Sequence, residues 1–170
     1  FSIRINDENS NKCFLMRDRV GVKPLYYFKF ENGIYFSSEL KPLLNYNNTL
    51  KLNIKGLISY LELNYVNDSN SIYKSIYQIK PAQLLEITNG QITNETYYWR
   101  LDQTTETHEG YNEKLEIENE SILIDSINIR NRTDVPICAF LSGGIDSSLI
   151  VALYSKYLNL NLETYTIKFD

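Results

Sequence analysis

The sequence predicts two consecutive domains of different class: an α+β layered domain, then the start of an α/β domain with a parallel sheet. The first prediction rests on four short strand-like runs within residues 1–37. The second rests on an apolar run, residues 135–141, that leads through Ser-Gly-Gly into a helical run. Between them, residues 101–110 are polar, lack apolar periodicity and end in glycine, as is typical of a linker. We therefore expect domains at 1–103 and 104–170.

Composition and charge narrow the class of protein. The chain has 170 residues, 43% of them hydrophobic, and a net charge of −4 without a basic cluster. We therefore expect no nucleic-acid partner and no anionic membrane surface. No apolar run approaches the roughly 20 residues of a membrane span, and no signal peptide is visible. Phe1 is not a start methionine, so we expect the chain to begin inside a longer protein, and two cysteines without metal-site spacing fit a reducing cytoplasm.

The strands of the first domain are predicted from alternation and turn residues. Four runs alternate apolar and polar side chains or end at turn signals: residues 1–5, 13–16, 25–30 and 34–37. Asn32-Gly33 joins the last two, and this dipeptide favours a tight hairpin turn. Strands in such quick succession imply an antiparallel sheet. We interpret Arg17-Asp18, after the second strand, as an ion pair that fixes the turn at Gly21.

The rest of the first domain is predicted to be two short helical segments and a closing hairpin. Residues 39–44 form a helical turn, and Leu57, Ile58 and Leu61 have helical spacing within a helix at 54–63. The hairpin joins strands at 84–87 and 97–99 around Asn89-Gly90.

The second domain is predicted to open as helix, strand, glycine-rich loop, helix and strand. The first helix, residues 112–132, has acidic residues in its first half and arginines at its end, which suits the helix dipole. Its apolar stripe is Leu115, Ile122, Leu123, Ile127 and Ile129. The run 135–141 has no alternation, which is typical of a strand buried on both faces, and 162–169 supplies a second strand. This order predicts a βαβ unit, whose ligands lie beyond the carboxyl ends of the strands.

The loop Leu141-Ser142-Gly143-Gly144-Ile145-Asp146-Ser147-Ser148 lies at such an end. Paired glycines permit positive φ and close approach of a ligand, and the start of the following helix binds anions through its free N–H groups. The loop has no Walker A lysine and no Gly-x-Gly-x-x-Gly pattern. The alternative is a plain glycine turn in which Asp146 or Ser147 caps the helix.

These residues resemble a known family. The loop resembles the Ser-Gly-Gly-x-Asp-Ser pyrophosphate loop of the N-type ATP pyrophosphatases. Residues 17–27 (Arg-Asp-Arg-Val-Gly-Val-Lys-Pro-Leu-Tyr-Tyr) and 36–41 (Phe-Ser-Ser-Glu-Leu-Lys) resemble the later part of the glutaminase domain of glutamine-dependent asparagine synthetases. Ile76 to Pro81 and Tyr98-Trp99 add weaker support, whereas Ala82 stands where the family usually has glycine. The resemblance implies part of a glutaminase-type, Ntn hydrolase-like layered domain, followed by the start of an ATP pyrophosphatase domain.

The resemblance also implies a reaction. In the family, a cysteine at the mature N-terminus releases ammonia from glutamine. The synthetase domain uses ATP and Mg²⁺ to adenylate the side-chain carboxylate of aspartate, and ammonia then displaces AMP to give asparagine. The resemblance thus implies glutamine and aspartate as substrates and a cytoplasmic location. A homodimer is one alternative for the oligomeric state.

The roles of the loop residues follow from this resemblance. The N–H groups of Gly143, Gly144 and Ile145 would hold pyrophosphate, with further bonds from the hydroxyls of Ser142, Ser147 and Ser148. Asp146 cannot donate to phosphate at neutral pH, so we expect it to hold the metal. Leu141 and Ile167 would line the adenine and ribose side through main-chain contacts.

We assign no catalytic residue, because the N-terminal cysteine nucleophile is expected upstream of this chain. Phe1 cannot replace it and Cys13 lies within a predicted strand, so the 170-residue chain alone is expected to be inactive. Two alternatives stay open: a relative that amidates another carboxylate acceptor, and a non-catalytic module that keeps the fold. The intact loop favours the enzyme.

Overall fold

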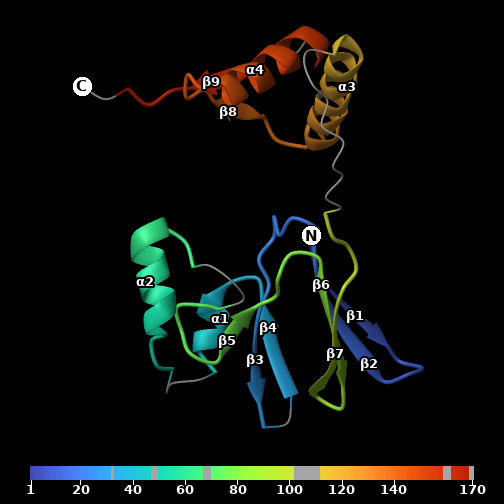
Figure 1. Ribbon diagram of the computed structural model, residues 1–170, viewed down its shortest axis with the longest axis vertical. Helices are drawn as coiled ribbons and strands as arrows, with labels where there is room; N and C mark the ends of the chain where they lie inside the picture. The colour runs from blue at the N-terminus through green and yellow to red at the C-terminus, as the bar shows by residue number, and fades with distance from the viewer. Residues whose placement is uncertain (32, 47–49, 67–69, 102–111, 159–161, 169–170) are drawn as a thin grey trace. The chain divides into compact units, whose positions relative to one another are not determined.

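The computed structural model describes residues 1–31, 33–46, 50–66, 70–101, 112–158 and 162–168. The chain divides into two compact units, Phe1–Gln103 and Thr104–Asp170 (Figure 1). Apart from Leu101, the predicted linker lies outside the described residues, and so does Asn32 of the predicted hairpin turn. Each unit is described by itself below.

The described residues of the first unit form two antiparallel sheets and two helices. The four-stranded sheet has the order β1-β2-β6-β7, with β1 at Ser2–Asp7, β2 at Lys12–Arg17, β6 at Gln83–Thr88 and β7 at Gln91–Tyr97. The three-stranded sheet has the order β4-β3-β5, with β3 at Tyr26–Phe30, β4 at Gly33–Ser37 and β5 at Ile76–Gln78. Helices α1 (Leu40–Leu44) and α2 (Ile54–Leu63) follow β4. The predicted strands and their antiparallel direction are confirmed, but the four early strands divide between two sheets because β2 pairs with β6 rather than with β3.

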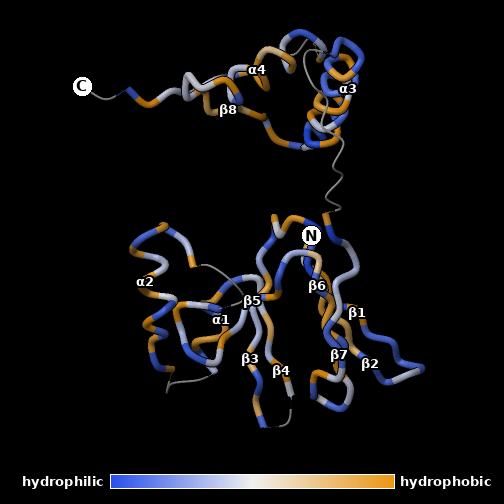
Figure 2. The backbone as a smooth tube through the Cα atoms, in the orientation of Figure 1, coloured by the Kyte–Doolittle hydropathy of each residue, from blue (hydrophilic) through white to orange (hydrophobic). Residues whose placement is uncertain are grey.

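The core of the first unit lies between the sheets and beneath α1. One buried cluster contains Leu15 and Leu85 from the first sheet together with Tyr27 and Ile79 on the other side. A second cluster joins Phe28 and Ile76, which point to the opposite face of β3 and β5, to Leu43 of α1. Figure 2 shows orange, white and blue stretches alternating along the strands of this unit. The order of layers is therefore sheet, sheet and helix, and the Ntn hydrolase-like layering implied by the resemblance stays a prediction.

Helix α2 is buried through a glycine and not through its predicted apolar stripe. The predicted helix is confirmed with the same bounds, but Ile58 and Leu61 of the spacing that predicted it are exposed, with Leu61 73% accessible. The buried residue is Gly56. A Cβ atom placed on Gly56 would lie 2.5 Å from the carbonyl oxygen of Ser71, which belongs to the main chain beside the helix. The absence of a side chain at Gly56 therefore lets that segment approach.

This contact predicts that Gly56→Ala destabilises the first unit, although alanine favours helix by about 1 kcal/mol over glycine. The clash is with backbone and cannot be relieved by a rotamer change, so we expect a loss of about 1–3 kcal/mol in the free energy of unfolding. Urea unfolding followed by the fluorescence of Trp99, the only tryptophan, measures it. Gly33→Ala is the matched control, because nothing lies within 4 Å of a Cβ there. Equal stabilities of the two variants would contradict the argument.

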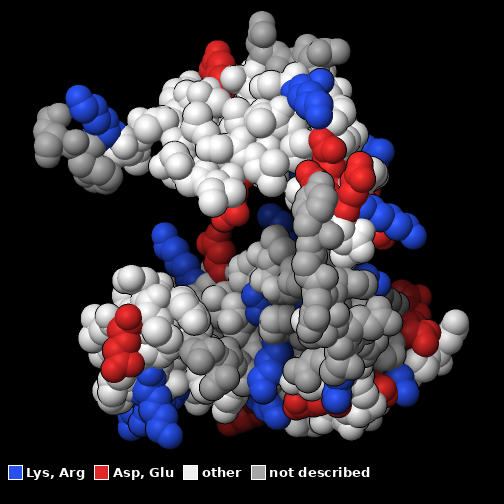
Figure 3. All heavy atoms as spheres, turned by 45° about the horizontal axis from the view of Figure 1, so that its top comes forward, with Lys and Arg blue, Asp and Glu red and all other residues white. Residues whose placement is uncertain are grey.

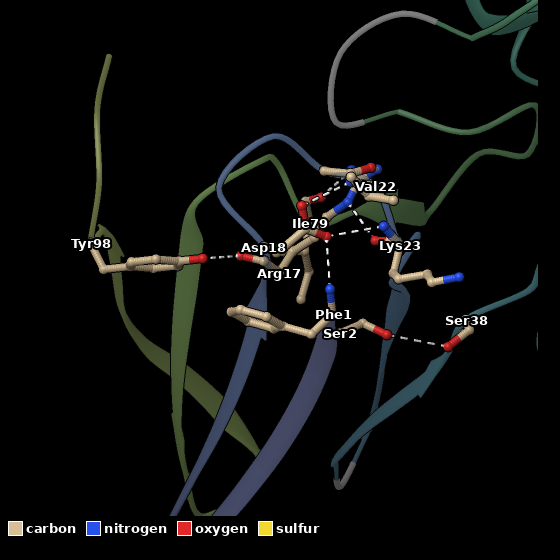
Figure 4. Close-up of polar contacts among 10 residues, drawn as sticks. Phe1, Ser2, Arg17, Asp18, Val22, Lys23, Ser38, Ile79 and Tyr98 are labelled. Carbon is tan, nitrogen blue, oxygen red and sulfur yellow. Dashed lines mark hydrogen bonds and ion pairs between the residues drawn. The ribbon is translucent and has the colours of Figure 1, made fainter. Parts of the chain in front are cut away.

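The turn between β2 and β3 is held by Arg17 and Asp18 (Figure 4). Arg17 is buried and donates to three main-chain carbonyl oxygens: from Nε to Lys23 at 2.8 Å, from Nη1 to Ile79 at 2.8 Å and from Nη2 to Gly21 at 2.6 Å. The Asp18 carboxylate accepts from the N–H groups of Val22, at 2.9 Å, and Lys23, at 3.0 Å. Each side chain thus binds main chain and fixes the turn that leads the chain from one sheet to the other.

Hydrogen bonds also govern the charge of Asp18. Burial alone would raise the pKa of its carboxyl group, but the hydrogen bonds from the N–H groups of Lys23 and Val22 bring the pKa well below the usual range. The carboxylate therefore stays ionised at neutral pH.

The closing hairpin is confirmed at its turn and wrong in its second strand. Thr88 pairs with Gln91 around Asn89-Gly90, and both turn residues have positive φ. A two-residue turn starts the return strand at once, so β7 covers Gln91–Tyr97 and not 97–99. The hydroxyl of Tyr98 instead donates to the carbonyl oxygen of Arg17 at 2.7 Å. Ala82, where the family resemblance expects glycine, has a φ of +57°, in the left-handed region that glycine adopts more easily.

The second unit contains α3 (Glu113–Arg130), β8 (Cys138–Phe140), α4 (Ile145–Leu158) and β9 (Glu163–Tyr165). The predicted parallel pairing of β8 and β9 is confirmed, with Cys138 opposite Glu163, but each strand has three residues and is shorter than the predicted runs 135–141 and 162–169. The unit's core joins Ile127 of α3 to Leu153 and Tyr154 of α4.

Two predictions about burial in the second unit are wrong. The stripe of α3 divides between two faces, because Ile122 and Ile129 are more than half exposed while Ile127 is buried. The strand expected to be buried on both faces is exposed, with Phe140 79% accessible. The physical reason is that β8 pairs with β9 alone within the described part of the chain.

Candidate functional site

The Ser-Gly-Gly loop connects the carboxyl end of β8 to the first turn of α4, the place that the sequence predicts. Gly143 has a φ of +82°, and nothing lies within 4 Å of a Cβ placed there. The loop backbone is therefore open to a ligand on the side where a side chain would otherwise stand. Gly144, Ile145 and Asp146 are also exposed, with Ile145 86% accessible.

The N–H groups of the loop point to anion binding. The N–H of Ser148 donates to the carbonyl oxygen of Gly144 at 3.1 Å, so α4 begins at the glycine pair. Donors before that point, on Ile145, Asp146 and Ser147, have no acceptor inside the helix. Together with the helix dipole they suit an anion at the first turn.

Two of the three predicted hydroxyl donors bind each other. The Oγ atoms of Ser142 and Ser147 are 3.1 Å apart, and Ser147 also donates to the carbonyl oxygen of Gly144 at 3.1 Å. Because a hydroxyl has one proton, Ser142 is then the donor to Ser147. These bonds hold the ends of the loop together, and Ser142 must rotate its proton away before it can bind a phosphate oxygen.

Asp146 lies in the first turn of α4, and its side chain is exposed. In the described part of the chain, neither Asp146 nor Ser147 accepts a hydrogen bond from a helix N–H with its side chain, which is what the capping alternative requires. A carboxylate at a solvent-open phosphate loop is suited to Mg²⁺, which binds proteins through one or two carboxylates together with substrate phosphates. The described residues contain no group of three or more His, Cys, Asp or Glu that could hold a metal by themselves.

A cavity of about 400 Å³ adjoins the loop and is lined by Phe140, Leu141, Ser142, Tyr165 and Ile167. The fold therefore brings together Leu141 and Ile167, the two residues predicted for the base and ribose. A larger cavity of about 750 Å³ lies between α3 and α4, where Lys156 pairs with Glu120 at 3.3 Å, and contains no loop residue.

The main chain of Leu141 is already engaged inside the protein. Its N–H donates to the carbonyl oxygen of Tyr165 at 2.9 Å, and its carbonyl oxygen accepts from Oγ1 of Thr166 at 2.7 Å. The predicted main-chain contact of Leu141 with a nucleotide is thus limited to the second lone pair of that carbonyl. The sequence analysis assigned no role to Thr166. Its only signal in the sequence is a hydroxyl side chain within the predicted strand run 162–169.

Charged side chains form a mixed surface. On the face shown in Figure 3, basic and acidic residues are interspersed, and no extended patch of one sign is visible among the described residues. No described helix is long and apolar enough to cross a membrane.

Comparisons with known proteins divide the chain at the same region. Residues 1–99 match the family described as glutamine amidotransferase domain, and residues 118–170 match the family described as asparagine synthase. Two similar proteins are the glutamine-hydrolysing asparagine synthetases 1 and 2 of Bacillus subtilis. They are 32% and 34% identical to this chain, over 100% and 98% of it and over 26% and 24% of their own lengths. An amidase of Gibberella zeae is 26% identical over 100% of the chain and 27% of its own length.

The chain spans about a quarter to a third of the length of the curated relatives it matches first. The match to the amidotransferase family covers more than half of the chain, and the asparagine synthase match follows it without overlap. The chain therefore belongs to the glutamine amidotransferase family, in the domain order of the glutamine-hydrolysing asparagine synthetases.

Proposed function

We propose that this chain is a segment of a glutamine-hydrolysing asparagine synthetase. Its first unit would be the later part of the glutaminase domain, 1–103, and its second the start of the ATP pyrophosphatase domain, 104–170. The observation that carries the proposal is the open Gly143 turn, which leads into α4 with free N–H groups and an exposed Asp146. A non-catalytic module has no need of that geometry.

In the proposed reaction, the chain's own residues bind and orient ATP. The loop N–H groups from Gly143 to Ile145 would donate hydrogen bonds to the phosphate oxygens, aided by the hydroxyls of Ser142, Ser147 and Ser148, and Asp146 would hold Mg²⁺. The metal supplies positive charge that offsets the charge developing on the leaving pyrophosphate. The cavity beside Leu141 and Ile167 would seat the base and ribose.

A second acceptor class is favoured by one comparison. The Gibberella zeae relative is named an amidase and not an asparagine synthetase. Another carboxylate could therefore replace aspartate while the chemistry of ATP and ammonia stays the same. We place the protein in the cytoplasm, as for a biosynthetic enzyme with glutamine and aspartate as substrates.

The test is product formation by the whole protein with ATP, Mg²⁺, glutamine or ammonium, and either aspartate or a panel of other carboxylates. We expect asparagine, AMP and pyrophosphate in equal amounts, and pyrophosphate release that requires aspartate. If pyrophosphate release requires a different carboxylate, that carboxylate and not aspartate is the acceptor. Absence of release with every carboxylate would reject the enzyme in favour of the module.

A further inference from the structure

We propose that Thr166 is a positioning residue for the base of the nucleotide, acting through the main chain at the end of β9. The proposal rests on the proposed function, because it concerns the same ATP site. It assigns a role to a residue that neither contacts the phosphate loop's glycines nor belongs to the Ser-Gly-Gly sequence.

The evidence is the way in which the parallel ladder of β8 and β9 ends. The last paired residues are Phe140 and Tyr165. Beyond them, the N–H of Leu141 donates to the carbonyl oxygen of Tyr165, as in a regular parallel ladder. In that pattern a residue that donates to one partner residue accepts from the N–H two positions further along the partner strand. The regular donor to the carbonyl of Leu141 would therefore be the N–H of Ile167.

The side chain of Thr166 takes that place. Its Oγ1 donates to the carbonyl oxygen of Leu141 at 2.7 Å, a short hydroxyl bond. Within the described residues, the N–H of Ile167 has no recorded acceptor, and Ile167 lies in the lining of the cavity of about 400 Å³. The hydroxyl of Thr166 thus satisfies the sheet's carbonyl and releases a main-chain donor at the cavity wall.

A released N–H at this position has a chemical use. A purine presents ring nitrogens that accept hydrogen bonds, and a main-chain donor fixed by the sheet would orient such a base without side-chain entropy cost. The adjacent carbonyl of Leu141 keeps one lone pair for an exocyclic amino group. Thr166 would thus fix the positions of the Ile167 N–H and the Leu141 carbonyl relative to each other.

The experiment compares Thr166→Val, which keeps the shape and removes the hydroxyl, with Thr166→Ser, which keeps the hydroxyl. In the whole protein we expect Thr166→Val to raise both the Kd and the KM for ATP by about fivefold, or about 1 kcal/mol, with kcat changed less than twofold. Thr166→Ser should stay within twofold of wild type. Thr164→Val, two residues earlier and within the exposed strand β9, is the matched control and should change neither constant.

Amide hydrogen exchange gives a second readout that a merely structural role would not produce. Without the hydroxyl, the N–H of Ile167 can complete the ladder to Leu141, so its exchange should slow in Thr166→Val and in Thr166→Ala while the fold is kept. Unchanged ATP binding and unchanged exchange at Ile167 in both variants would overturn the role of Thr166 and leave the proposed function intact. A wild-type protein that neither binds ATP nor releases pyrophosphate would instead overturn the proposed function, and this proposal with it.

Discussion

Arg17→Met should lower the free energy of unfolding of the first unit by about 3 kcal/mol or more. The substitution keeps a long apolar stem but removes the donors to the carbonyl oxygens of Gly21, Lys23 and Ile79. The carbonyl of Ile79 is buried, and leaving it without a partner costs about 1–3 kcal/mol. Each of the two part-buried bonds, to Gly21 and Lys23, comes from a charged group and contributes about 1.5–3 kcal/mol. The loss is large because one side chain joins the turn after β2 to the end of β5, and so the two sheets to each other.

Urea unfolding of the 170-residue chain, followed by Trp99 fluorescence, measures this loss in the first unit alone. Arg4→Met is the matched control, because Arg4 is exposed on β1 and binds no main-chain carbonyl in the described structure. It should change stability by less than about 0.5 kcal/mol. Arg17→Lys should fall between the two, since an ammonium cannot reproduce the planar fork of three donors. A loss below about 1 kcal/mol for Arg17→Met would show that water or rearrangement satisfies the carbonyls.

Asp146→Asn in the whole protein should reduce ATP-dependent pyrophosphate release at least about tenfold, or roughly 1.4 kcal/mol of transition-state stabilisation. The amide keeps the shape of the side chain and removes the charge that attracts a dication. Glutamine hydrolysis should largely survive, because it is assigned to the other domain. The measurement is steady-state pyrophosphate release across a Mg²⁺ titration, which should show a raised Mg²⁺ requirement.

The capping alternative predicts a different outcome, because asparagine caps a helix about as well as aspartate. Asp146→Asn would then be nearly silent. Asp125→Asn, an exposed aspartate on α3, controls for the loss of one negative charge on the same unit. If Asp146→Asn and Asp125→Asn release pyrophosphate alike, with the same Mg²⁺ requirement, Asp146 does not bind the metal.

The interpretation of Arg17 and Asp18 shows why tertiary structure was needed. The sequence predicted an ion pair between these neighbours that fixes the Gly21 turn. The turn is fixed, but the predicted pair is wrong: Arg17 binds carbonyl oxygens and Asp18 binds N–H groups. One of those carbonyls belongs to Ile79, far away in the sequence. A partner contributed by a distant strand has no local signal.

Local chemistry determined what the sequence could predict. Alternation and turn residues were enough to place β1 to β4 and the turn at Asn89-Gly90, because φ preferences and side-chain direction act within a few residues. The glycine turn before α4 was predicted in the same way, since glycine permits the positive φ found at Gly143, and phosphate binding by this loop stays a prediction.

Only the tertiary structure decided which surfaces these elements bury and which donors they release. The spacing predicted helices α2 and α3 but not their buried faces, because a helix can be buried through a glycine, as at Gly56, or on one of two apolar faces. The pairing of β2 with β6 depends on residues some seventy positions apart. Thr166 was missed for the same reason: its hydroxyl matters only where β9 meets the end of β8, and strand pairing creates that meeting.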